Sequence, residues 1–239
     1  MGKAHRRWKV LAHEPIEKLA ENLWFVRGAL PGMSLRRTMV VARLQTGGLV
    51  IHNGIALEES AQAELEAWGT PEILVVPCGI HRLDAHAYKE RYPALRVICP
   101  SGARAKVEEV VPVDGGYEDS GVTDDSVRFE MLAGMGNQEG AMLVRSQDGT
   151  TVVVNDAMFN MDRPKDLLGN VITAILGSAP GPRVSRLAKL ALVKDKKALR
   201  GEFERFAAMP DLVRVIVAHE KVASGPAARE ALRTAAGYL

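Results

Sequence analysis

Three apolar segments of the chain each lead directly into a histidine or an aspartate. The segments are residues 73–76, 151–155 and 212–218, and the side chains that follow them are His81, Asp84, Asp156 and His219. Imidazole nitrogens and carboxylate oxygens bind metals such as zinc, and they also accept and donate protons in active sites. If the segments are strands of one core, the loops at their ends bring these side chains together.

Two imidazoles and two carboxylates would suffice for one Zn, Mn or Fe ion, each of which accepts mixed nitrogen and oxygen ligands. Ligands for a second ion are not evident, so at most one is predicted. His81 and Asp84 are also candidate catalytic residues, since Asp84 could orient His81 as a general base without any metal. A third interpretation stays open, in which they only hydrogen-bond each other or nearby backbone, with Asp84 capping the next helix.

The composition fits one large domain, or one domain with an inserted subdomain. The chain has 239 residues, of which 47% are hydrophobic, and its net charge of +2 argues against a dedicated nucleic-acid or membrane-surface protein. No apolar run approaches the ~18 residues of a transmembrane helix. Cys78 and Cys99 end apolar runs without a Cys-x-x-Cys spacing, which is typical of buried thiols. We therefore expect a cytoplasmic protein with a small-molecule substrate or ligand, no membrane partner and no nucleic acid, and a homodimer stays open.

Strands and helices alternate along most of the chain. Residues 1–20 are polar and predict a loosely held leader whose histidines are solvated, whereas 21–239 form one domain. Within it, the pattern changes at about 157–194, which predicts an insertion or a helical lid. Hydrophobic periodicity and turn residues predict helices at 58–68, 85–91, 196–209 and 226–236, and strands at 23–27, 38–45, 49–52, 73–76, 96–99, 127–132, 141–146, 151–155 and 213–217.

Further polar residues follow other predicted strands and are expected to line the same pocket. His52 and Asn53 end the strand at 49–52, and the Gly-rich stretch 134–140 contains Asn137 and Glu139. That stretch lacks the Lys and the Ser or Thr of a phosphate-binding loop, so we interpret it as a strand connection. The segment 183–200 holds seven basic residues and one acid, which favours a solvated helix face over a nucleic-acid surface because no aromatic residue is present to stack on bases.

The order of elements and the residues at the strand ends resemble the metallo-β-lactamase superfamily over about residues 20–225. The resemblance implies an αββα sandwich, in which two mixed β-sheets pack face to face with helices on the outer faces, and a site at the sheet edge. The family signature His-x-His-x-Asp-His is replaced here by Pro-Cys-Gly-Ile-His-Arg-Leu-Asp at 77–84. One histidine, His81, remains, and Asp84 is the candidate for a second ligand.

The other family positions are also partly replaced. Asn137 stands where the family has its next histidine, and the early Asp-x-Gly appears as His52-Asn53-Gly54. The resemblance assigns the bridging aspartate to Asp156 and the final histidine to His219. It therefore implies a divergent, hydrolase-like member that binds one metal ion or none and acts on an ester or phosphoester. The alternative is a non-catalytic member that binds a small ligand, anionic ones included, in a remnant pocket.

Overall fold

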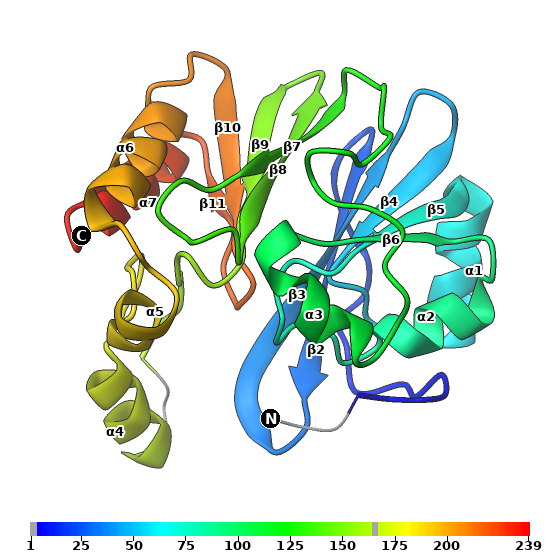
Figure 1. Cartoon of the computed structure of the whole chain (residues 1–239), viewed down its shortest axis with the longest axis horizontal. Helices are drawn as coiled ribbons and strands as arrows, with labels where there is room; N and C mark the ends of the chain where they lie inside the picture. Colours follow the sequence, from blue (N-terminus) through cyan, green and yellow to red (C-terminus); the bar gives the residue numbers. More distant parts are fainter. Residues whose placement is uncertain (1–3, 164–166) are drawn as a thin grey trace.

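The computed structural model describes residues 4–163 and 167–239 of the chain. Within these residues the strands form two sheets that pack face to face, with helices outside (Figure 1). The first sheet contains, in spatial order, β1 (Glu17–Ala20), β2 (Leu23–Leu30), β3 (Met33–Arg43), β4 (Gly48–His52), β5 (Thr70–Val75) and β6 (Arg96–Ile98). The second contains β11 (Ala223–Ser224), β10 (Leu212–Ile216), β9 (Gly149–Val153), β8 (Gly140–Ser146) and β7 (Val127–Met131).

Both sheets are mixed, as predicted. In the first sheet β4, β5 and β6 run parallel, whereas β1 to β4 are joined by antiparallel pairing. In the second sheet β9 and β10 are parallel and the remaining neighbours are antiparallel. The predicted hairpin around Asp148-Gly149 connects β8 to β9, with Ser146 opposite Gly149.

The alternation of side chains along the strands explains the layers. Successive side chains of a strand point to opposite faces. In β2, Leu23 and Phe25 therefore join the apolar cluster between the two sheets, whereas Trp24 and Val26 join the cluster under the helices. Each of these four side chains is buried, and full burial of a side chain of this size stabilises the fold by about 1.5–3 kcal/mol.

Helices cover both outer faces and complete the αββα sandwich. On the first sheet lie α1 (Glu59–Trp68), α2 (Ala85–Arg91), the 3₁₀ turn η1 (Ser101–Ala103) and α3 (Arg104–Glu108). On the second lie α6 (Lys196–Ala207) and α7 (Pro226–Ala236). The buried Leu65 of α1 and Tyr88 of α2 pack on the first sheet, and Phe203 of α6 and Leu232 of α7 pack on the second. The predicted four-layer architecture is confirmed.

The N-terminal segment is held more firmly than the sequence predicts. Its Trp8 ring lies 4.9 Å from the Tyr88 ring, centroid to centroid, and Trp8 Nε1 donates to the carbonyl oxygen of Leu57 at 3.0 Å. The half-buried His5 places its Nδ1 2.7 Å from Asp84 Oδ1, and β1 pairs with β2. The expectation of a loose, solvated leader is wrong for residues 4–20, because this segment supplies a large aromatic side chain and an edge strand.

The segment predicted as an insertion or lid contains two further helices, α4 (Leu167–Leu176) and α5 (Arg186–Ala191). The Ser185 side chain caps α5 by accepting a hydrogen bond from the backbone nitrogen of Ala188. Figure 1 shows α4 and α5 projecting below α6 and α7, beyond the second sheet. None of the helices formed by the described residues is long and apolar enough to span a membrane.

Candidate metal centre

The candidate site lies where four strands end at one edge of the sandwich. β4 and β5 are parallel neighbours in the first sheet, and β9 and β10 are parallel neighbours in the second, so each pair has its carboxyl ends side by side. β3 joins the two sheets at this edge. The backbone nitrogen of Thr38 donates to the carbonyl oxygen of Ala218 at 2.9 Å, and Thr38 Oγ1 donates to that of Val217 at 2.7 Å. The loops after these strands therefore converge, as the sequence predicts.

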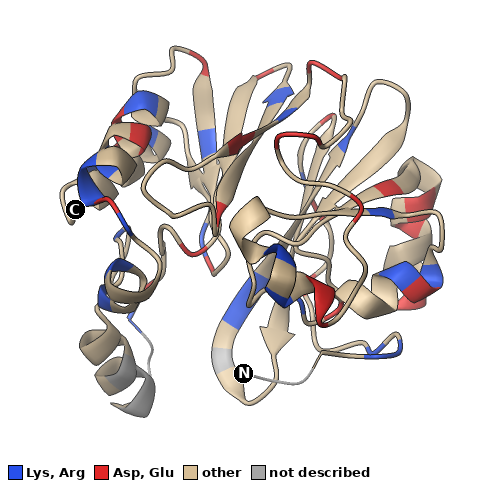
Figure 2. Ribbon diagram, viewed as in Figure 1, with Lys and Arg blue, Asp and Glu red and all other residues tan. Residues whose placement is uncertain are grey.

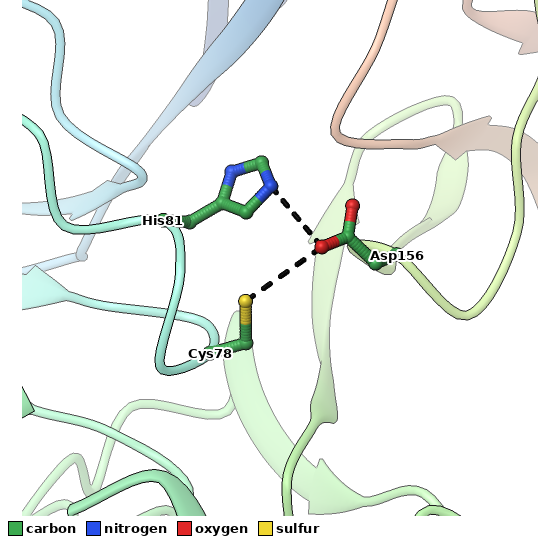
Figure 3. A group of neighbouring side chains, drawn as sticks. All are labelled: Cys78, His81 and Asp156. Atoms are coloured by element: carbon green, nitrogen blue, oxygen red, sulfur yellow. Dashed lines mark hydrogen bonds and ion pairs between the residues drawn. The ribbon is translucent and has the colours of Figure 1, made fainter. Parts of the chain in front are cut away.

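Cys78, His81 and Asp156 form a compact group of candidate metal ligands. One ligand atom from each residue lies within 4.8 Å of the other two. His81 Nε2 is 3.2 Å from Asp156 Oδ2, and Cys78 Sγ is 3.8 Å from the same oxygen (Figure 3). Cys78 and His81 come from the loop after β5, whereas Asp156 follows β9, so the group bridges the two sheets. Cys78 and Asp156 are buried and His81 is half-buried.

His219 adds a second imidazole to this group. Its Nε2 lies 3.5 Å from Asp156 Oδ1, and its Nδ1 lies 2.7 Å from the carbonyl oxygen of Arg36. Because a carbonyl oxygen can only accept, Nδ1 must carry the hydrogen, and in the neutral ring the lone pair of Nε2 faces Asp156. Two acceptors that face each other are stabilised by a cation that both can bind. A backbone partner on the second ring nitrogen is also typical of metal-ligating histidines.

Glu139 holds the loop that carries Asp156. Its two carboxylate oxygens accept hydrogen bonds from three successive backbone nitrogens, those of Asn155, Asp156 and Ala157, at 2.8–3.1 Å. Glu139 is only 1% exposed. The sequence predicts that Glu139 lines the pocket, but the structure places it beneath the loop, where it positions Asp156 through the backbone.

The buried charges of the group shift one another's ionisation. Burial raises the pKa of Asp156, but His81 and His219 outweigh this effect and hold that pKa well below its usual range. Burial and the neighbouring carboxylates of Asp156 and Glu139 raise the pKa of the Cys78 thiol well above its usual value. Burial and the charge of Asp156 also raise the pKa of Glu139 above its usual range. Cys78 is therefore a neutral thiol unless a cation joins the group, because binding to a metal is what deprotonates a buried thiol.

His52 brings an unused nitrogen to the same edge. It ends β4 and is fully buried, and no described residue offers its Nε2 a hydrogen bond. Burial, together with the nearby His81, lowers its pKa to about 3, so the ring is neutral at neutral pH. A buried nitrogen lacking a partner is costly, by about 1–3 kcal/mol, unless a ligand or ordered water satisfies it. This orphaned nitrogen and the S, N and O donors nearby fit a metal centre, with His52 as its neighbour.

Asp84 does not join the group, which corrects the predicted ligand set. Its Oδ2 accepts from Arg37 Nη2 at 2.5 Å and from the backbone nitrogen of Ala56 at 3.0 Å. Its Oδ1 lies 2.7 Å from His5 Nδ1. Both oxygens are therefore occupied by partners from the N-terminal half of the chain, and the proposed catalytic pairing of His81 with Asp84 is absent among the described contacts.

The two asparagines predicted to line the pocket lie in different places. Asn53 borders the cavity beside the site, but its Nδ2 is bonded to the carbonyl oxygen of Thr38 at 2.6 Å. Asn137 is exposed in the Gly-rich loop, where its carbonyl oxygen accepts from the backbone nitrogen of Gly102 at 2.8 Å. Asn137 therefore ties this loop to η1 and is not among the residues that line the cavity.

Solved structures with the same arrangement include several metallo-β-lactamases. One is DIM-1 metallo-β-lactamase exposed to ceftazidime, with a TM-score of 0.63 and 12% identity over 96% of this chain and 98% of that one. A second is the metallo-β-lactamase from Erythrobacter litoralis with β-mercaptoethanol in the active site, with a TM-score of 0.63 and 14% identity over 94% of this chain and 96% of that one. A third is the metallo-β-lactamase from Hirschia baltica, with a TM-score of 0.60 and 14% identity over 94% of this chain and 98% of that one. This chain has the metallo-β-lactamase fold. No protein-family model and no curated protein matches the sequence.

A cavity of about 620 Å³ opens beside the centre of this metallo-β-lactamase fold. His81 and His219 contribute to its lining, so both imidazoles face a space that a small molecule can enter. One wall is apolar and comes mainly from the hairpin between β2 and β3; it consists of Leu30, Pro31, Met33, Leu35, Ile80 and Leu83. Cavities of this size, with an apolar wall and a few polar groups, are typical of small-molecule sites.

The sequence prediction missed Cys78 as a member of the group. The residue was interpreted as a buried thiol, which it is, and like Cys99, also buried, it ends an apolar run. A signal was present nonetheless, because Cys78 lies three residues before His81 in a loop that breaks a buried strand with a proline and a glycine. Thiolate and imidazole so close at a strand end are typical zinc ligands.

Proposed function

We propose that this chain is a metal-dependent hydrolase of the metallo-β-lactamase fold with a single divalent ion. The proposed ligands of this ion are Cys78, His81, Asp156 and His219. This set differs from the one predicted from the sequence in that Cys78 takes the place of Asp84. The observation that carries the proposal is the convergence of the Cys78, His81 and Asp156 ligand atoms within 4.8 Å, at the edge of an open cavity. A set of one sulfur, two nitrogens and one carboxylate suits zinc best, because zinc binds all three donor types.

The chain's own residues then have separable roles. His81 and His219 border the cavity and would hold the ion together with the buried Cys78 and Asp156, whose thiolate and carboxylate would neutralise its charge. Glu139 fixes the Asp156 loop through backbone hydrogen bonds. When bound, such an ion acts as a Lewis acid that activates a water molecule and polarises a carbonyl or phosphoryl oxygen.

The lining of the cavity bears on the substrate. An apolar wall faces the two imidazoles, so the cavity suits a small molecule with an apolar part and a hydrolysable group at one end. Esters and phosphoesters fit this description. Of the arginines that line the cavity, Arg37 and Arg82 are paired with Asp84 and Glu109, and Arg6 is the third.

The test is a screen of chromogenic esters and phosphodiesters with protein loaded with Zn or Mn. We expect turnover of at least one class that falls by about 10²-fold or more in His81→Ala and Asp156→Asn, because each loses a ligand. Cys99→Ala is the matched control, since it removes a buried thiol elsewhere. Equal turnover in His81→Ala and the native protein would overturn the proposal.

A second candidate is a non-catalytic protein that binds a small ligand in this cavity. It is favoured by one observation, namely that Asp156 lies within reach of Cys78, His81 and His219, so the cluster is satisfied without an ion when the two imidazoles are protonated. A metal-free protein whose melting temperature rises with small carboxylates or phosphates, and which hydrolyses nothing in the screen, would support this alternative over the hydrolase.

A further inference from the structure

The helices α4 and α5 present an unusual amount of apolar surface. On α4, Leu167, Val171 and Ile175 are 81%, 48% and 66% exposed, and their spacing of four residues places them along one stripe. On α5, Leu187 and Leu190 are 55% and 85% exposed. The ten residues of α4 include no charged side chain. Contiguous exposed apolar surface of this kind marks an interaction site.

Basic side chains are concentrated in the segment that follows α4, from just before α5 into α6. They are Arg183, Arg186, Lys189, Lys194, Lys196, Lys197 and Arg200, whereas the same segment contains the single acid Asp195. Among residues 4–163 and 167–239, none of the seven forms an ion pair with a carboxylate, and Asp195 is engaged in capping α6. Figure 2 shows blue segments at α5, which lies next to α4, and further up at α6.

Arg186 connects the charge directly to the apolar helix. Its Nη1 donates to the carbonyl oxygen of Ile175, near the C-terminal end of α4, at 3.4 Å, while the rest of the guanidinium is exposed. Lys189 instead donates to the backbone of Tyr238, so α5 is also fixed to the C-terminus of the chain. The apolar stripe and the positive charge are therefore parts of one surface rather than two separate features.

We propose that α4 and α5 form a docking surface for an anionic lipid bilayer. Interfacial helices bury their apolar side chains in the outer few ångströms of the bilayer while basic residues contact lipid phosphates. At about 1.5 Å per residue, α4 is about 15 Å long, half the thickness of the hydrocarbon core, so it lies at the interface and does not span it. The net charge of +2 for the whole chain hides this concentration, which is why the composition predicts no membrane partner.

A second copy of the chain is the less favoured occupant of this surface. In a symmetric dimer the same patch meets itself, so the basic side chains of α5 in one protomer would face those of the other. An anionic bilayer neutralises the same charges. The β2–β3 hairpin, which forms one wall of the cavity, projects at the lower edge of Figure 1, as α4 does. A bilayer bound at α4 would therefore lie on the same side of the molecule as this wall.

The proposal is tested by sedimentation of the full chain with vesicles of phosphatidylcholine alone or mixed with phosphatidylglycerol. We expect binding to the anionic vesicles that weakens with salt and little binding to the neutral ones. Leu167→Gln with Ile175→Gln, and separately Arg186→Glu with Lys194→Glu, should each lower the partition coefficient by about tenfold or more.

Two matched variants serve as controls for this experiment. Leu167→Met with Ile175→Met keeps the stripe apolar, and Arg43→Glu with Arg145→Glu makes the same charge change on exposed arginines of β3 and β8. Both should bind like the native chain, and thermal unfolding confirms that every variant is folded. The absence of binding to anionic vesicles would overturn the proposal. So would a dimer in light scattering that becomes a monomer in the Leu167→Gln, Ile175→Gln variant, since a second copy would then cover the stripe.

Discussion

Arg37 and Asp84 form an ion pair that is closed off from solvent, with 2.5 Å between Arg37 Nη2 and Asp84 Oδ2 and side chains that are 3% and 0% exposed. His5 and the backbone nitrogen of Ala56 complete the environment of the carboxylate. Asp84 therefore ties β3 and the N-terminal segment to the start of α2. Its role is to hold these elements together beside the cavity.

This arrangement predicts that Asp84→Ala lowers the free energy of unfolding by about 3–5 kcal/mol, because it leaves the Arg37 guanidinium buried and unpaired. The metal content of the folded fraction should not change, since Asp84 is not a ligand. Urea unfolding measures the first effect and elemental analysis the second. Glu109→Ala, which breaks the exposed pair with Arg82, is the control and should change stability little. Loss of bound metal in folded Asp84→Ala would contradict this assignment.

Glu139→Gln tests whether the buried carboxylate positions Asp156. The amide nitrogen of glutamine is a donor and would face backbone N–H groups that are themselves donors. We expect metal affinity to fall by about 10–100-fold, as for other residues that orient a ligand, and the melting temperature to fall as well. Glu130→Gln, at a partly exposed ion pair on β7, should leave the metal affinity unchanged. Equal affinity in both variants would show that the loop does not need Glu139.

His52 predicts a pH dependence of stability. Its pKa is lowered from an ordinary value of 6.5 to about 3 by burial and by His81, so the unfolded chain binds a proton between these values while the folded chain does not. Stability therefore falls as the pH drops below 6.5, and from pH 7 to pH 5 this group alone removes about 2 kcal/mol. Urea unfolding of metal-free protein at the two pH values measures the effect. In His52→Gln the free energy of unfolding should differ less between pH 7 and pH 5 than in the native protein. An equal difference in the two proteins would refute the assignment.

The sequence predicted the elements that position the site better than the site itself. Asp156 and His219 could be singled out as candidates because each directly follows an apolar run, and the polarity change at a buried strand end is visible in the sequence. The four layers were also predictable, since the alternation in β2 already assigns Leu23 and Phe25 to one face and Trp24 to the other.

The roles of Asp84, Cys78 and Glu139 could not be predicted because they depend on contacts between residues far apart in the sequence. Asp84 has the type and spacing of a ligand, but its real partner, Arg37, is 47 residues away, and no local pattern joins them. Cys78 has an apolar environment in the sequence and becomes part of the group only because β9 brings Asp156 beside it. The role of Glu139 also depends on distant contacts, since it accepts hydrogen bonds from backbone nitrogens that lie 16–18 residues later.

Elemental analysis of protein purified without a histidine tag and without chelator tests the central claim most directly. We predict about one equivalent of zinc, manganese or iron, which is lost in Asp156→Asn and in Cys78→Ala but kept in Asp84→Asn and in Cys99→Ala. This pattern would assign the ion to the group that joins the two sheets. Metal that stays far below one equivalent after Zn and Mn are added back, or that is lost in Asp84→Asn and kept in Cys78→Ala, would contradict it.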